Sequence, residues 1–330
     1  MIPRIRLIAV GGTISTSDVD GSKLALPKFT GEDLIKGVPG VDQLAIVEVD
    51  NFSMVVSNRL SIEQVYQLAR HIRDVLLEDP ELTGVVVTHG TGTMEESAFM
   101  ADLMVSDHRP VVFTGAMRKT SDPFTDSYFN IYQAIQIAVS SEAKGKGVMV
   151  ALNSVIHSAR DVYKSHTTNV DSFQSGEFGP LGYVYPDHVH FSRTQLLRLN
   201  LYTEKPIFDV DLIKFVVGMD DRFIRCSVES GAKGIIIEGS GLGNVNDSVA
   251  EGIRNALRQG VTVVICSRCV NGKIFFSYGT KVSARALFDE GCILAPMQGP
   301  KARILLMLAL GITNDRQHIQ KMFDPQRDFL

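Results

Sequence analysis

The chain alternates short β-branched runs with segments of helical period, and this alternation constrains its fold more than any other feature. Most of the runs are bounded by Gly, Thr or Pro, which is typical of buried strands. Strands that alternate with helices predict an α/β fold, in which crossover helices join parallel strands. The expected strands are residues 6–10, 84–88, 110–114, 147–153, 214–218, 234–238 and 261–267.

The helical segments are predicted from the spacing of their apolar residues. Between Ile62 and Leu76, apolar residues recur on one face at the helical period. Ser61 precedes this run and Gln64 follows three positions later, the pattern of a capping box. Further helices are expected at residues 130–139, 248–258 and 301–310.

The length of 330 residues predicts about two domains at roughly 150 residues each. The alternation stops between residues 173 and 211, where glycine and proline are scattered without a sustained period. We therefore expect an N-terminal domain at 1–195, a linker at 196–212 and a C-terminal domain at 213–330.

Charge and hydropathy exclude several classes of partner. The chain carries 33 Lys and Arg against 37 Asp and Glu, and no basic block, so we expect no nucleic-acid partner. No apolar run approaches the roughly 18 residues that span a bilayer, so we expect no membrane partner. The apolar stretch at residues 7–10 is too short for a secretory signal, which predicts a cytoplasmic protein.

The four cysteines all lie in the last third of the chain, which suits a reducing compartment better than a disulfide framework. Cys266 and Cys269 form a lone C-x-x-C pair. A zinc site needs a second pair of ligands at matching spacing, and the sequence offers none. We favour buried structural thiols over a redox or metal role, and we expect no metal.

Ligands of an open parallel sheet bind beyond the carboxyl ends of its strands. After the first strand, Gly11 and Gly12 allow a close approach of the backbone and place the Thr13 hydroxyl at the mouth of the sheet. A dinucleotide fingerprint would need a third glycine, which is missing. A tight turn without a ligand is the alternative for this segment.

After the strand at 84–88, the segment His89-Gly90-Thr91-Gly92-Thr93 gathers hydroxyl and backbone N–H groups. Glu95 and Glu96 follow at the expected start of a helix, where negative charge is stabilising. A Walker loop would need a lysine directly before a serine or threonine, and the segment has none. This pattern favours a ligand-binding loop over a plain turn.

Two basic residues lie near further strand ends. Arg118 either binds an anionic substrate or pairs with Asp126, and we favour the structural pairing because most such neighbours are structural. Lys164 follows the fourth expected strand; a lysine in a loop is usually solvated, although this one is placed to converge on the same edge of the sheet.

These segments together are specific enough to indicate a family. The chain resembles the two-domain bacterial-type L-asparaginases, amidohydrolases with a threonine nucleophile. The matching motifs, in order, are Gly11-Gly12-Thr13-Ile14, His89-Gly90-Thr91-x-Thr93-Met94-Glu95-Glu96, Gly115-Ala116-Met117-Arg118, Asp126 with Phe129-Asn130, Arg160-Asp161-Val162-x-Lys164, Gly179-Pro180-Leu181-Gly182 and Lys301-Ala302-Arg303-x-Leu305-Leu306.

The resemblance implies a large N-terminal α/β domain with a mixed or parallel sheet flanked by helices, and a smaller C-terminal domain with a parallel sheet. It implies a homotetramer built as a dimer of dimers, a small-molecule amide substrate and no cofactor. By resemblance, Thr13 is the nucleophile that forms an acyl-enzyme, and Thr91 and Lys164 form a second group that tunes a threonine or a water.

The resemblance also implies the residues that bind the substrate. Ser57 is similar to the serine that holds the substrate carboxylate, and Asn58 stands where the family has glutamine. Backbone N–H groups near Thr91, including the turn at Gly90, and near Ala116 would form the oxyanion hole.

The sequence departs from the family pattern where the substrate amine binds. Gly92 stands in place of the aspartate that holds the α-ammonium group, and residues 271–289 contain no counterpart of the glutamate that a neighbouring subunit supplies. Without that aspartate, burial would lower the pKa of Lys164, unless Glu95 or Asp126 takes over the pairing.

The loop after Thr13 also departs from the family, since residues 15–30 contain no tyrosine to activate the nucleophile. Phe29 is the only aromatic residue there, and Asp20 and Gly21 suggest a flexible lid.

Three hypotheses remain open. The chain is a plain asparaginase, or an amidase for an asparagine analogue whose α-amine is absent or acylated, or a family member that lost activity and acts in binding or regulation. Because an unpaired ammonium in a closed site costs several kcal/mol, the loss of its partners favours the analogue. The presence of Thr13, Ser57, Thr91 and Lys164 disfavours the regulatory hypothesis.

Overall fold

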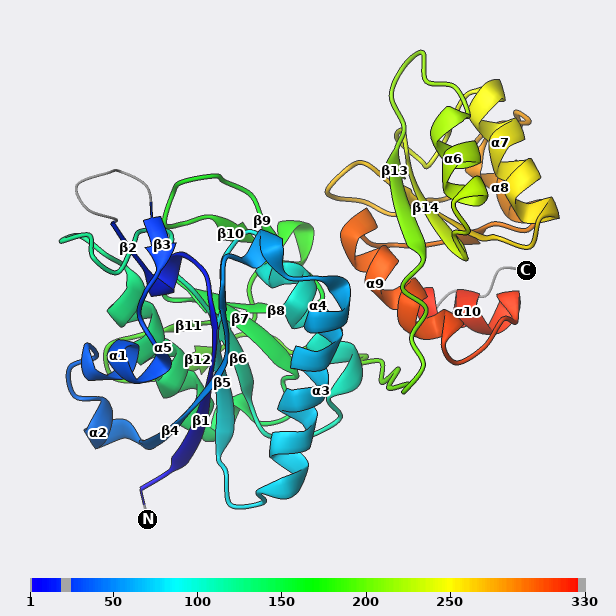
Figure 1. Cartoon of the computed structure of the whole chain (residues 1–330). Helices are drawn as coiled ribbons and strands as arrows, with labels where there is room; N and C mark the ends of the chain where they lie inside the picture. The colour runs from blue at the N-terminus through cyan, green and yellow to red at the C-terminus, as the bar shows by residue number, and fades with distance from the viewer. Residues whose placement is uncertain (1, 19–24, 326–330) are drawn as a thin grey trace. The chain divides into compact units, whose positions relative to one another are not determined.

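The computed structural model describes residues 2–18 and 25–325, which divide into two units, Met1–Asn200 and Leu201–Leu330 (Figure 1). The predicted lid at Asp20 and Gly21 lies outside the described residues. Among the described residues, no helix is long and apolar enough to cross a membrane.

The first unit is built on an eight-stranded mixed sheet. In sheet order its strands are β12 (Val189–Phe191), β11 (Gly182–Val184), β8 (Val155–Ser158), β7 (Val148–Leu152), β6 (Val111–Thr114), β5 (Gly84–Thr88), β1 (Arg4–Gly11) and β4 (Ile46–Val55). The strands from β7 to β4 run parallel, whereas β8, β11 and β12 add antiparallel pairs at one side. The carboxyl ends of β1, β4, β5 and β6 therefore meet at one edge.

Helices cover both faces of this sheet (Figure 1). They are α1 (Gly31–Lys36), α2 (Val41–Leu44), α3 (Ile62–Glu78), α4 (Met94–Met104) and α5 (Ser127–Val139). On one face, Leu34 of α1 and Ile131 of α5 pack with Leu7, Val86 and Val112 of the central strands. On the other face α3 packs beside α4. The burial of these apolar faces supplies the main stabilisation of the unit.

The capping box predicted for α3 is confirmed. The Ser61 side chain accepts a hydrogen bond from the Gln64 backbone, and the Gln64 side chain accepts one from the Ser61 backbone. The helices predicted at 130–139, 248–258 and 301–310 are confirmed with small shifts at their starts.

The short elements near the strand ends position the site. They are the 3-10 turns η1 (Thr13–Ser15), η2 (Ser57–Arg59), η3 (Ser141–Ala143) and η4 (Gly176–Phe178), and the strand pairs β2 (Thr16–Asp18) with β3 (Ala25–Pro27) and β9 (Tyr163–Lys164) with β10 (Phe173–Gln174).

The second unit has a smaller sheet of four parallel strands, in the order β13 (Val210–Lys214), β14 (Gly234–Gly239), β15 (Thr262–Ser267) and β16 (Ile293–Leu294). The helices α6 (Arg222–Glu229), α7 (Asp247–Arg258) and α8 (Ala284–Asp289) contribute to one core, which includes Ile224, Ile253 and Leu287. The helices α9 (Gly299–Leu310) and α10 (Arg316–Phe323) pack on the other face (Figure 1). The two-domain α/β fold class is thus confirmed.

One predicted strand is wrong and one strand was missed, each for a physical reason. The strand predicted at 214–218 is wrong, because β13 pairs with β14 from Val210 to Lys214 and Val217 is 93% exposed. This strand begins inside the predicted linker 196–212. The sequence analysis did not find β4, because its acidic and amide residues, such as Glu48 and Asn51, interrupt the apolar pattern on a half-exposed strand at the side of the sheet.

Candidate active site

The edge of the first sheet gathers the predicted site residues from several strand ends. Thr13 follows β1, Ser57 follows β4, Thr91 follows β5 and Ala116 follows β6. Because these strands are parallel neighbours, segments far apart in the sequence meet at this edge.

Two glycines bring the loops after β1 and β5 into backbone contact. Gly12 has a φ of +88°, and a Cβ on it would lie 2.1 Å from the Cα of Gly90. No side chain fits there, so the glycine is required both by its backbone angle and by the close approach. This packing fixes Thr13, which is half-buried in η1 directly after Gly12.

The hydroxyl of Thr13 has no hydrogen-bond partner among the residues that the structure describes. Its carbonyl oxygen accepts a hydrogen bond of 2.7 Å from the Thr16 hydroxyl, which holds the turn. The Thr120 hydroxyl donates to the carbonyl of Ile14 and so ties this turn to the loop after β6. The turn is therefore anchored through its backbone, and its side-chain hydroxyl is left available.

Ser57 is packed against the loop after β5. A Cβ on Gly90 would lie 2.8 Å from the Ser57 Oγ, and a Cβ on Gly92 would lie 3.2 Å from the same atom. The Thr93 hydroxyl donates to the Ser57 carbonyl at 3.2 Å. Ser57 is only 7% exposed, yet its hydroxyl has no partner in the described part of the chain.

Lys164 and Thr91 form a hydrogen-bonded side-chain pair at this edge. The Lys164 Nζ donates to the Thr91 Oγ1 at 2.8 Å, and Thr91 is buried. The Glu95 carboxylate accepts a hydrogen bond from the backbone N–H of Lys164 and so holds β9 against the start of α4. Burial lowers the pKa of Lys164, and the charge of Glu95 opposes this shift.

Two pairings were considered for Lys164, one with Glu95 and one with Asp126, and only Glu95 affects its pKa. Glu95 is the carboxylate that acts on Lys164, although no carboxylate of the described residues forms an ion pair with its Nζ. Asp126 does not take this role, since its two oxygens accept hydrogen bonds from the backbone N–H groups of Met117 and Arg118.

Asp126 instead holds the loop after β6. One oxygen also accepts from the Asn130 side chain, which in turn donates to the Gly115 carbonyl at 2.9 Å. The favoured ion pair between Arg118 and Asp126 is wrong, because the Arg118 guanidinium donates to the Phe124 carbonyl. The network fixes the backbone on both sides of Ala116, which is fully buried.

His89 lies in the core behind the loop after β5. Its Nδ1 is 2.8 Å from the Gly90 carbonyl and its Nε2 has no partner among the described residues. Complete burial lowers the pKa of His89 to about 4, so the ring is neutral at pH 7. A neutral ring with its proton on Nδ1 donates to Gly90 and orients this loop.

The remaining predicted residues differ in their placement. Asn58 is exposed, and its side chain forms no hydrogen bond to the other site residues in the described structure. The sequence analysis named Glu95 as a possible partner of the Lys164 amine, but it did not foresee that the carboxylate accepts from the Lys164 backbone N–H. It also missed a hollow of about 410 Å³ whose lining residues are Gly92, Glu95, Lys164, Ser165, His166 and Thr167.

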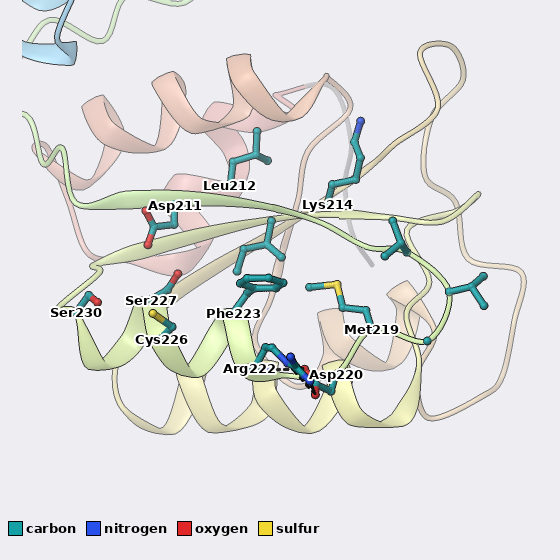
Figure 2. A pocket seen from close by; sticks show the side chains of 14 residues that line it. Asp211, Leu212, Lys214, Met219, Asp220, Arg222, Phe223, Cys226, Ser227 and Ser230 are labelled. Carbon is teal, nitrogen blue, oxygen red and sulfur yellow. Dashed lines mark hydrogen bonds and ion pairs between the residues drawn. The ribbon is translucent and has the colours of Figure 1, made fainter.

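A larger hollow of about 690 Å³ lies in the second unit between β13 and α6 (Figure 2). Phe223 and Met219 line its apolar part, and the ion pair of Asp220 with Arg222 lies at its border. Its described lining contains no hydroxyl or thiol that is hydrogen-bonded to a base. The predicted site residues all lie in the first unit.

The described residues offer no group of three or more His, Cys, Asp or Glu that could hold a metal ion. Cys266 is buried and Cys269 is exposed, and neither forms a disulfide. The expectation of buried thiols thus fails for Cys269, which lies in the loop after β15.

Comparisons with known proteins match these features over nearly the whole chain. Residues 4–197 match the family model described as Asparaginase, N-terminal, and residues 209–323 match that described as Glutaminase/Asparaginase C-terminal domain. The chain is 35% identical to L-asparaginase 2 of Bacillus subtilis (98% of this chain, 86% of the relative) and 32% identical to L-asparaginase 2 of Escherichia coli (98% and 93%).

A solved structure agrees with the fold. The probable cytoplasmic L-asparaginase from Campylobacter jejuni superposes with a TM-score of 0.89 at 33% identity, covering 97% of this chain and 99% of that chain. The agreement in fold therefore extends over both units and is not limited to the segments that carry the site. With both family models matched across the two units, the chain belongs to the asparaginase family of amidohydrolases.

Proposed function

We propose that the protein releases ammonia from the side-chain amide of asparagine, or of a related carboxylate-bearing amide, through a threonine acyl-enzyme. The observation that carries this proposal is the hydrogen bond from Lys164 to Thr91. It lies at the edge of the sheet that presents the hydroxyl of Thr13, for which the described residues offer no partner. A nucleophile, a base and backbone donors on parallel strand ends are the parts that acyl transfer needs.

In the first step, the Thr13 Oγ forms a bond to the amide carbon and its proton passes to the leaving nitrogen. The C–N bond breaks, ammonia leaves and a threonine ester remains. In the second step, a water molecule adds to the ester carbon, the C–Oγ bond breaks, and a proton of that water passes to the Thr13 oxygen while the acid product leaves. Lys164 and Thr91 act on this water, because the lowered pKa of Lys164 eases proton transfer.

Two further groups serve binding. The Ser57 hydroxyl, buried and unpaired in the described structure, donates to the substrate carboxylate. The backbone N–H groups of the loop after β5 and of the segment at Ala116 stabilise the oxyanion. The networks of His89 and Asp126 hold these backbones in place.

The proposal extends to a cytoplasmic homotetramer built from two dimers, with no cofactor. The names of the relatives support the substrate class, and the name of the Campylobacter jejuni protein supports the compartment. Light scattering of the purified protein tests the oligomeric state, and a stable monomer would contradict it.

A second substrate class is supported by Gly92. This residue places no carboxylate beside Ser57. A Cβ at residue 92 would lie 3.2 Å from the Ser57 Oγ, so a side chain there would stand next to Ser57. A substrate ammonium would find no negative partner at this position, so an amide whose α-amine is absent or acylated fits the site better.

An ammonia-release screen tests both classes. Asparagine, glutamine, succinamate and N-acetyl-asparagine are compared at several concentrations, with the Thr13→Val variant as the negative control. Ammonia release that survives in Thr13→Val would contradict the role of Thr13 as the nucleophile. A clear preference for free asparagine would contradict the second substrate class and leave the first.

A further inference from the structure

The hollow beside Gly92 adjoins the reacting groups. Its lining includes Lys164, whose Nζ donates a hydrogen bond to Thr91, and Gly92, the residue after Thr91 in the chain. Its volume of about 410 Å³ lies at the lower end of the range for small-molecule sites. A group that is attached to a substrate held by Ser57 and Thr13 therefore has space to extend into it.

The backbone does not require glycine at residue 92. Its φ is not among the positive values, and an added Cβ would meet one atom, the Ser57 Oγ, at 3.2 Å. Gly12 and Gly90 contrast with it, since an added Cβ on either would lie under 3.0 Å from neighbouring atoms. Glycine at residue 92 thus leaves space beside Ser57, and the backbone conformation does not require glycine there.

His166 is an exposed residue in the lining of the hollow, and its ring has one nitrogen already engaged. The backbone N–H groups of Thr168 and Asn169 both donate to its Nδ1, at 3.0 and 2.9 Å. Two donors require a free lone pair on Nδ1, so the neutral ring carries its proton on Nε2. This Nε2–H has no partner among the described residues.

The described lining of the hollow has no excess of negative charge to hold a cationic group when Lys164 is protonated. Lys164 contributes a positive charge when protonated, and Glu95 is the only carboxylate in the described lining. One oxygen of Glu95 is already engaged with the Lys164 backbone. A neutral group that carries a hydrogen-bond acceptor matches this lining better than an ammonium does.

We infer that this hollow is a substrate subsite for an acyl group on the α-nitrogen of an asparagine-type amide, and that the His166 Nε2–H donates to the acyl carbonyl oxygen. The inference rests on the proposed amide hydrolysis and adds the subsite and its specificity residue. An asparagine at the C-terminal end of a peptide belongs to the same substrate class, because its α-nitrogen is acylated and its α-carboxylate is free.

Steady-state kinetics on N-acetyl-L-asparagine, succinamate and L-asparagine test the inference. The wild type is expected to hydrolyse N-acetyl-L-asparagine with a kcat/KM at least tenfold above those of the other two. In the His166→Asn variant, the new side-chain oxygen keeps the acceptor for the two backbone N–H groups, as in an Asx turn, but the distal donor is lost.

For N-acetyl-L-asparagine, His166→Asn is expected to raise KM about five- to tenfold with little change in kcat, as for the loss of one hydrogen bond. The rise for succinamate, which lacks the acyl group, is expected to be at least fivefold smaller. His108→Asn is the matched control, because this exposed histidine precedes β6 at the opposite end of the strand. His108→Asn is expected to leave the KM for N-acetyl-L-asparagine and the KM for succinamate unchanged.

Two outcomes would overturn the subsite. One is equal loss with all three substrates in His166→Asn, which would indicate a structural role only. The other is a wild-type enzyme that hydrolyses asparagine as well as its N-acetyl derivative. If no amide releases ammonia, the proposed function fails, and calorimetry then decides on the subsite alone. Tighter binding of N-acetyl-L-aspartate than of L-aspartate, reversed by His166→Asn, would support it, and equal binding would overturn it.

Discussion

Lys164 donates a hydrogen bond of 2.8 Å to the Thr91 hydroxyl across a sequence separation of 73 residues. The pair joins a two-residue strand, β9, to the loop after β5. Glu95 fixes the same strand by accepting a hydrogen bond from the Lys164 backbone. The position of Lys164 is thus set by the main chain, and its amine is left to act on Thr91.

The first prediction concerns this pair as a unit. Thr91→Val and Lys164→Met are each expected to lower kcat by about 10²–10⁴-fold, the range for general acid–base catalysis. The double variant is expected to cost no more than the worse single variant, because the two groups serve one step. Single-turnover kinetics with the best amide measure this. Lys36→Met, an exposed lysine at the end of α1, is the control. Losses that multiply would show that the two groups act independently.

The second prediction concerns the pH dependence of activity. Burial lowers the pKa of Lys164 and the charge of Glu95 raises it. If the neutral amine is the active form, activity rises with pH through this lowered pKa, below the ordinary value of 10.5. Glu95→Gln removes the opposing charge, so the pKa falls further and the rising limb of the kcat profile moves to lower pH.

The Gln side chain in Glu95→Gln still accepts the backbone hydrogen bond of Lys164, which keeps the geometry. Kcat measured from pH 5 to 10 in both proteins checks the shift. A limb that stays in place, or moves to higher pH, would contradict a role of Lys164 as the base. Glu63→Gln at the start of α3 serves as a matched control for the loss of a carboxylate.

The sequence predicts the centre of each sheet better than its sides. The strands β5 and β14 are buried along their whole length, so their apolar runs identify them without ambiguity. The exposed residues Val216 and Val217 look equally strand-like, but they lie beyond the pairing with β14 and face solvent. Hydrophobicity alone does not reveal which apolar run finds a partner.

The candidate site likewise has residues that the sequence indicates and one that it does not. Resemblance to a family indicated Thr13, Ser57, Thr91 and Lys164, and the fold brings the segments that carry them to one edge. His166 gave no signal in the sequence, because its tautomer depends on a turn formed by the two residues that donate to it. Such a feature exists only in three dimensions, where backbone donors meet a ring nitrogen.

The third prediction concerns the loop that holds Ala116. Asp126→Ala removes the acceptor of two backbone N–H groups and of the Asn130 side chain. Because the loop then loses its anchor, kcat is expected to fall at least tenfold with a smaller change in KM. Asp126→Asn keeps one acceptor oxygen, so its kcat is expected to lie between those of the wild type and of Asp126→Ala. Asp122→Ala, in the same loop, is the control, since among the described residues its side chain accepts a hydrogen bond only from the backbone of Phe124. An unchanged kcat in Asp126→Ala would exclude this segment from the oxyanion site.

The fourth prediction concerns the pH dependence of stability. His89 is completely buried and its pKa falls from 6.5 to about 4. The folded state therefore resists protonation at a pH where the unfolded chain accepts it. The stabilisation is fully present above pH 6.5 and is lost as the pH falls toward 4. At 1.36 kcal/mol per pKa unit, the free energy of unfolding loses about 2 kcal/mol by pH 5 and about 3 kcal/mol by pH 4 from this group.

His89→Asn removes the titrating ring but keeps a side-chain N–H for the Gly90 carbonyl. Its free energy of unfolding at pH 7 is expected to be lower than that of the wild type, because the smaller side chain leaves a cavity. Its dependence on pH between 7 and 5 is expected to be flatter by about 2 kcal/mol. Urea denaturation of the whole protein, monitored in the first unit by hydrogen exchange of the β5 amides, measures both quantities. His108→Asn, which replaces an exposed histidine, is expected to leave the slope unchanged. Equal slopes in His89→Asn and the wild type would show that the His89 ring is protonated as easily in the folded core as in the unfolded chain.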